Sequence, residues 1–185
     1  MKTTRIFLAT AFMLAAFAVN AQDKFYTKNG KIDFYSKAPM EDIEAKNKTA
    51  AAILDTKTGA VQFSVVMKGF EFPKALMQEH FNENYVESDK YPKAEFKGAI
   101  VNNSDINYAK DGTYTARVKG KLTIHGVTRD VESTGTLKVD DGKINTNSSF
   151  NVLLSDYNIK IPAVVKDKLS NTIKVSVDCK LEPLK

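Results

Sequence analysis

The side chains that could carry out catalysis are few in this sequence. It contains two histidines, His80 and His125, and one cysteine, Cys179. Two histidines are too few for a three-histidine metal site, and Cys179 would have to supply the third ligand from an interior strand position. No serine lies in a G-x-S-x-G motif, and no phosphate-binding or dinucleotide-binding motif is present. The sequence therefore predicts a protein that is not an enzyme, with no catalytic and no metal-binding residues.

Both histidines also have simpler structural interpretations. His125 precedes a glycine at a predicted bend, where we expect its ring to hydrogen-bond the turn. His80 falls on the polar side of a predicted helix, where solvent would surround it. Cys179 has the strand parity of buried apolar residues, and a single cysteine cannot form an intramolecular disulfide.

Apolar side chains give a stronger signal, and it is a signal for binding. A helix is predicted over residues 74–86, where Met77, Phe81 and Tyr85 recur at every fourth residue and therefore share one face. This helix either caps one end of the fold or forms a lid over an apolar cavity. Large apolar walls with few polar groups are typical of a lipid or prenyl site. Each buried methylene contributes roughly 0.8 kcal/mol, so a long chain would need no ionic anchor.

The elements around this helix alternate in hydrophobicity as strands do. The stretch from Thr113 to Arg129 places apolar or small side chains on one face as far as Ile124 and polar ones on the other, which predicts an extended strand. At roughly 3.3 Å per residue this strand would be on the order of 40 Å long, a length that suits a twisted sheet closing on itself. Gly120, on the apolar side, would allow the bend that closure needs.

The same alternation predicts further strands at residues 31–37, 43–47, 50–54, 60–67, 93–101, 129–139, 143–154 and 172–181. Turns are predicted at Asn29-Gly30, Asp111-Gly112 and Asp140-Asp141-Gly142. We therefore predict an all-β fold, a closed antiparallel β-barrel of about eight strands with one inserted α-helix near its mouth. Such a barrel has room either for packed side chains or for one small ligand.

The first 21 residues have the features of a signal peptide. A positively charged start precedes an apolar run from Ile6 to Val19, which is short for a membrane span, and small residues fit a cleavage site after Ala21. We expect residues 1–21 to be removed, so that residues 22–185 form one barrel domain in the periplasm or outside the cell.

Charge excludes further classes of partner. Removal of Lys2 and Arg5 lowers the formal net charge from +5 to +3. Basic and acidic residues are interspersed, without the basic patch and aromatic platforms that nucleic-acid binding requires, so we expect no nucleic-acid partner. No later stretch approaches the length of a membrane span, so we expect no stable membrane insertion.

The stretch GKLTIHGVTRDV, from Gly120 to Val131, resembles the signature of the YceI-like family. Other segments agree in the same order, namely Ile32 to Ser36, Glu79 to Pro92, Phe96 to Gly98 and Asp156-Tyr157. This resemblance implies an exported, lipocalin-like barrel with a helix near its mouth and a long internal tunnel. It further implies a polyisoprenoid, an isoprenoid quinone or a fatty-acid-like molecule as the ligand, and it supplies no catalytic residues.

We therefore expect a carrier that sequesters one long-chain apolar small molecule without a covalent cofactor. The predicted ligand-binding residues are Phe63, Val65, Met67, Phe96, Leu122, Phe150 and Val152 on the wall, and Phe70, Phe72, Met77, Phe81 and Tyr85 at the mouth. A homodimer is a further state that the sequence allows. Two alternatives remain: a packed barrel that acts as an envelope-stress interaction module through its helix surface, and an enzyme that uses His125.

Overall fold

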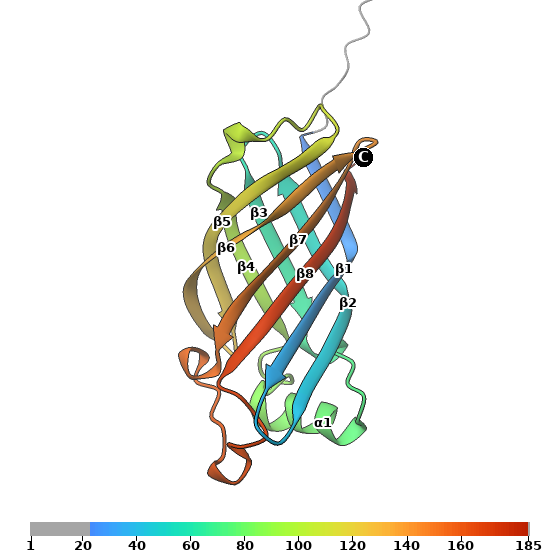
Figure 1. The fold of residues 1–185 in the computed structure, drawn as a ribbon. Coiled ribbons are helices and arrows are strands. Elements are labelled where there is room, and N and C mark those ends of the chain that lie inside the picture. The colour runs from blue at the N-terminus through green and yellow to red at the C-terminus, as the bar shows by residue number, and fades with distance from the viewer. Residues whose placement is uncertain (1–22, 185) are drawn as a thin grey trace, which may run out of the picture.

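The computed structural model describes residues 23–184, and the predicted signal peptide lies outside these residues. They form a closed barrel in which eight antiparallel strands follow one another in chain order, and the first strand pairs with the last (Figure 1). The strands are β1 (Lys24–Lys37), β2 (Asp42–Asp55), β3 (Ala60–Val66), β4 (Lys93–Ile100), β5 (Gly112–Ile124), β6 (Val127–Asp140), β7 (Lys143–Leu153) and β8 (Thr172–Pro183). The predicted fold class is confirmed.

The two ends of the barrel differ. At one end, called the helix end here, the α-helix α1 (Ala75–His80) lies beside the β1–β2 hairpin (Figure 1). The long connection between β7 and β8 extends past the strands at the same end and contains the 3₁₀ turns η4 (Leu154–Tyr157) and η5 (Ala163–Val165). The opposite end, called the far end, carries the start of β1 and the end of β8.

Strand β1 is longer than predicted, because the predicted turn at Asn29-Gly30 is a bulge. The pairing of β1 with β2 shifts register on both sides of Gly30, and the strand continues through it. A Cβ atom on Gly30 would lie 2.6 Å from Sγ of Cys179 in β8, so the close approach of these strands leaves space only for glycine there. The two strands predicted at residues 43–47 and 50–54 form one strand, β2, because both pair with β1, on either side of the bulge.

The predicted helix is divided into two geometries. Helix α1 begins after Lys74 and is followed by a π-helical turn, η2 (Phe81–Tyr85). In that turn the N–H of Val86 donates a hydrogen bond to the carbonyl oxygen of Phe81, five residues earlier. Single π-turns of this kind inside helices are often found at functional sites. None of the α1 side chains is buried, so the helix lies over the barrel end rather than inside a core.

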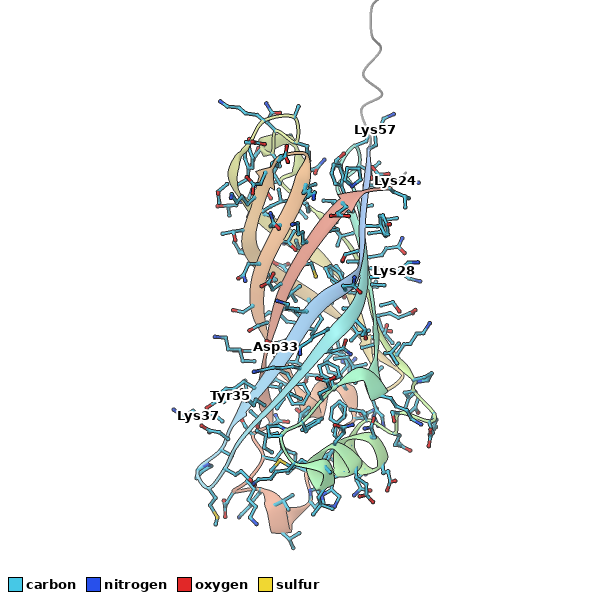
Figure 2. All side chains as sticks on the ribbon, turned by 90° about the vertical axis from the view of Figure 1, so that its right-hand side faces the viewer. Lys24, Lys28, Asp33, Tyr35, Lys37 and Lys57 are labelled. Atoms are coloured by element: carbon cyan, nitrogen blue, oxygen red, sulfur yellow. The ribbon has the colours of Figure 1, made fainter. Side chains whose placement is uncertain are left out.

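The core consists of two clusters, one toward each end. The far-end cluster is closely packed around Leu137, Ile144 and Leu181, while the helix-end cluster includes Met67 and Phe70. The outer face of the barrel is polar, and in Figure 2 the charged residues that are labelled along β1 lie on its outside. The sheet therefore has the alternation that its sequence predicted.

Two tight turns have the predicted chemistry, whereas the turn predicted at Asp111-Gly112 is wrong, since Gly112 is the first residue of β5. His125 in the β5–β6 turn and Asp141 in the β6–β7 turn both have positive φ angles, 51° and 48°, and a glycine follows each. Positive φ at both central residues is the geometry of the type I′ hairpin, whose twist matches that of the strands. Gly120 of β5 lies opposite Gly98 of β4, and a Cβ atom on either would come within 2.6 Å of the Phe96 ring.

Candidate functional site

The barrel encloses a cavity of about 690 Å³. All eight strands contribute inward-facing side chains to its wall, and most of these side chains are aliphatic or aromatic. The volume lies within the range of about 300–1,000 Å³ that is typical of pockets for small molecules. The interior is therefore not filled by the side chains of the strands.

The twelve residues that the sequence predicts as ligand contacts all lie on the wall of this cavity. They are Phe63, Val65, Met67, Phe70, Phe72, Met77, Phe81, Tyr85, Phe96, Leu122, Phe150 and Val152. Phe63, Phe96 and Phe150 point inward and yet are only half-buried, because part of each ring faces the empty interior. Their contact with a ligand stays a prediction, while their position on one shared surface is a feature of the fold.

The opening of the cavity lies at the helix end. Exposed residues from several segments of this end line the cavity, including Lys74 and Leu76 around α1 and Lys168 before β8. At the far end, by contrast, Val139 and Ile144 belong to the packed core and do not line the cavity. The cavity is thus a pocket closed at one end, with a mouth beneath α1 and the β7–β8 connection.

Four phenylalanine rings gather beside this mouth, and one of them, Phe34, was missed by the sequence prediction. Its ring centroid lies 5.3 Å from that of Phe70, 5.6 Å from Phe72 and 5.5 Å from Phe81. Such distances, with tilted or edge-to-face rings, are favourable for aromatic pairs. This phenylalanine cluster joins β1 to the segment before α1 and to η2. The signal that could have identified Phe34 is its parity with the inward-facing Ile32.

Sequence reasoning also missed the polar part of the wall. Oγ of Ser133 in β6 lies 2.6 Å from Oγ of Ser148 in β7, and Thr146 lines the cavity next to them. One serine hydroxyl donates a hydrogen bond to the other. This hydrogen bond reduces the free-energy cost of placing two polar groups in an apolar wall. They can also offer a hydrogen bond to an oxygen atom of a molecule in the barrel.

His125 lies outside the cavity lining and connects two segments of the helix end through its ring nitrogens. Its Nδ1 atom lies 3.1 Å from the carbonyl oxygen of Tyr157, and its Nε2 atom lies 2.6 Å from Oε2 of Glu87. The Tyr91 ring and the imidazole pack edge to face, with centroids 4.7 Å apart. His80, in contrast, is exposed at the cavity mouth.

Cys179 is buried, as its parity predicted, and burial raises the pKa of its thiol to about 11. It is therefore protonated at neutral pH and is a poor nucleophile and metal ligand. Among residues 23–184, no group of three histidine, cysteine or acidic side chains is placed to hold a metal ion. Within the same residues no helix has the length and apolar character needed to cross a membrane.

Together, the closed eight-stranded antiparallel sheet and the apolar cavity inside it define a barrel of the lipocalin type, whose interior has the size for one small ligand. The sequence matches the model of a protein family, the YceI-like domain, over residues 4–181. The chain therefore belongs to the YceI-like family. No curated protein matches the chain at the level of sequence.

Solved structures share this fold at low sequence identity. A domain from Saccharophagus degradans, described as a polyisoprenoid binding domain implicated in plant cell wall breakdown, has a TM-score of 0.76 and 13% identity over 88% of this chain and 99% of its own. BcnA of Burkholderia cenocepacia has a TM-score of 0.67 and 17% identity over 82% of this chain and 95% of its own. The YceI protein of Campylobacter jejuni has a TM-score of 0.53 and 14% identity over 97% of both chains.

Proposed function

We propose that the protein is an exported carrier that binds one long-chain apolar molecule, a polyisoprenoid or a similar lipid, inside its barrel. The observation that carries this proposal is the apolar cavity of about 690 Å³ with exposed lining residues at the helix end. Membership of the YceI-like family supports it, as does the likeness of the fold to a domain described as polyisoprenoid binding. The packed-barrel alternative requires a filled interior, which this cavity does not support.

The size of the cavity sets the size of the ligand. A cavity of about 690 Å³ lies within the range typical of small-molecule sites, and its largely apolar wall suits a hydrocarbon chain. A chain longer than the cavity would leave one end at the mouth. Ten buried methylenes alone contribute about 8 kcal/mol, part of which is lost in ordering the chain.

Binding rather than catalysis is the activity that the side chains support. His125 uses both ring nitrogens in contacts with Tyr157 and Glu87, and the buried Cys179 thiol is protonated at neutral pH. The polar groups on the cavity wall include a pair of serine hydroxyls that hydrogen-bond each other. The carrier would act in the periplasm or outside the cell, and the support for that location is the signal-peptide pattern of residues 1–21.

Native mass spectrometry of the gently purified protein tests this proposal. We expect an adduct with the mass of a lipid, its loss after extraction with organic solvent, and its return when the extracted protein is incubated with geranylgeraniol or a long-chain fatty acid. The recovered molecule should be chemically unchanged, since a carrier does not convert its ligand. A protein that shows only its bare mass in every preparation and takes up neither compound would overturn the proposal.

A further inference from the structure

The connection between β7 and β8 carries an apolar tip between lysines. In Figure 1 this segment, drawn in orange, extends past the ends of the strands at the helix end. Within residues 160–168, called the lysine-flanked loop here, the 3₁₀ turn η5 presents Val164 with 89% of its surface exposed. Lys160 precedes the turn, and Lys166 and Lys168 follow it.

Two further exposed apolar side chains lie at this end. Met40 in the β1–β2 hairpin is 69% exposed and Leu76 on α1 is 61% exposed. With Val164 they are the three most exposed large apolar side chains among residues 23–184. The N–H of Met40 donates a hydrogen bond of 2.9 Å to the carbonyl oxygen of Asp167, so the hairpin and the lysine-flanked loop are neighbours. We call Met40, Leu76 and Val164 the apolar rim.

The apolar rim borders the mouth of the cavity directly. Leu76 lines the cavity, and so do Val165 and Lys168 of the lysine-flanked loop. Whatever covers the apolar rim therefore also faces the opening through which a molecule enters the barrel.

The charges around the rim favour an anionic partner on one side. Within residues 23–184, Lys160, Lys166 and Lys168 take part in none of the ion pairs, and Lys37 lies at the same end of the barrel (Figure 2). Asp167 is the acidic residue within the loop. Lys74 and Glu41 pair at 2.7 Å and neutralise each other. Glu79 and Glu83 belong to the helical segment rather than to the loop, where three lysines outnumber one aspartate. Asp42, close to Met40 in the β1–β2 hairpin, accepts a hydrogen bond from the hydroxyl of Tyr35.

We propose that the helix end docks on the surface of a bilayer that contains anionic phospholipid. Val164 and Met40 enter the interface while the lysines contact the headgroups, the combination by which peripheral segments bind membranes. The mouth of the cavity then faces the lipids, so that a long apolar chain passes between bilayer and barrel without crossing water. Only this last step rests on the proposed carrier function, since the docking itself stands on the exposed apolar rim and the lysines.

Sedimentation of the purified protein with large vesicles tests the docking. We expect binding to vesicles of phosphatidylcholine and phosphatidylglycerol that weakens as salt is added, and little binding to phosphatidylcholine alone. Two variants, Val164→Asp and the double variant K166E/K168E, should each lower the binding at least about tenfold. All three side chains are exposed, so the fold should survive, and thermal unfolding followed by circular dichroism verifies that it does.

Matched controls change the same residue types at the far end. Val101, which is 51% exposed, is replaced by aspartate, and K57E/K110E repeats the double charge reversal. Lys57 lies at the far end in Figure 2. We expect these controls to bind vesicles as the parent does. Equal losses in the control variants, or no binding of the parent to the anionic vesicles, would overturn the proposal.

The remaining outcomes separate docking from the alternatives. If V164D abolished a self-association seen by analytical ultracentrifugation while the parent ignored vesicles, the rim would be a face between two copies and the proposal would be wrong. If the parent bound anionic vesicles through the rim but took up no lipid, docking would stand and the carrier function would fail. The expected result is that V164D takes up geranylgeraniol from detergent as the parent does but takes it up from vesicles more slowly.

Discussion

The Nε2 atom of His125 lies 2.6 Å from Oε2 of Glu87. His125 occupies the β5–β6 turn, and Glu87 follows the π-helical turn η2, so the contact ties the segment that covers the mouth to the wall of the barrel. Both residues have positive φ angles, 51° for His125 and 45° for Glu87. The second ring nitrogen reaches the carbonyl oxygen of Tyr157, which brings the β7–β8 connection into the same junction.

Replacement of His125 by asparagine should loosen this junction. Asparagine tolerates the positive φ angle, but its shorter side chain does not reach both Tyr157 and Glu87. We therefore expect the free energy of unfolding, measured in urea, to fall by about 1–3 kcal/mol. Hydrogen exchange should accelerate mainly in residues 81–92. Glu87→Gln retains an acceptor for the ring and should cost less. An H125N variant with unchanged stability and exchange would show that the junction contributes nothing.

Filling the cavity should block binding without harming the fold. Val131 lines the cavity and is only half-buried, so Val131→Phe has space for its ring and should change the free energy of unfolding by less than about 1 kcal/mol. Val139, on the same face of β6, lies in the packed far-end core, where phenylalanine should cost about 1–3 kcal/mol. Lipid uptake by native mass spectrometry should fall for V131F. Equal destabilisation by both variants would mean that the interior is packed throughout.

The close approach of Gly30 and Cys179 predicts a coupled pair of substitutions. In Gly30→Ala the new methyl group would meet Sγ of Cys179 at 2.6 Å, and the carbonyl oxygen of Ala50 at 3.0 Å. We expect the free energy of unfolding to fall by roughly 1–3 kcal/mol, because the added methyl group overpacks this site. In a protein that already carries Cys179→Ala, the Gly30→Ala substitution should lower the free energy of unfolding by at least about 0.5 kcal/mol less than it does in the parent. A double-mutant cycle from urea denaturation gives this difference, and additive effects would contradict the assigned contact.

Alkaline pH should weaken the fold through Tyr108. Burial raises the pKa of its phenol from 10.0 to about 12, and its hydroxyl donates a hydrogen bond of 2.7 Å to Oδ1 of Asn103. In the unfolded chain the phenol ionises near pH 10, whereas in the folded protein it stays neutral until about pH 12. The stabilisation that Tyr108 contributes is therefore complete below pH 10 and is lost as pH rises from 10 to 12.

The variant Tyr108→Phe isolates this effect from the titration of other groups. At pH 7 it should be less stable than the parent by about 1 kcal/mol, because one hydrogen bond is lost. As pH rises above 10, the difference should shrink and then reverse. The urea midpoints of both proteins between pH 7 and 11.5 measure this difference in stability. A difference that does not change with pH would contradict the raised pKa of Tyr108.

Local sequence patterns predicted the barrel because its elements are encoded locally. The alternation of β5 carries through to Ile124, and the glycines after His125 and Asp141 mark hairpin turns that the φ angles confirm. Parity along the strands placed the predicted wall residues on the cavity, and helical spacing did the same for Met77, Phe81 and Tyr85. Parity determines the face on which a side chain lies, and in a barrel one face is the interior.

The remaining features depend on contacts that parity does not contain. Asn29-Gly30 suits a turn and a bulge equally, and what requires glycine there is the close approach of Cys179 in the last strand. Phe34 has the parity of the interior, but its place in the phenylalanine cluster depends on where the helical segment packs. The π-helical turn η2 and the Ser133–Ser148 pair likewise arise from tertiary packing rather than from spacing.

The pairing of β1 with β8 has a consequence for the order in which the chain can mature. Each of the other strand pairs joins neighbours along the chain, whereas this seam joins the first strand to the last, Thr172–Pro183. Until β8 pairs with β1, both strands keep an unpaired edge and the sheet stays open. Closure of this seam is therefore the step that turns an open sheet into a barrel with an enclosed interior.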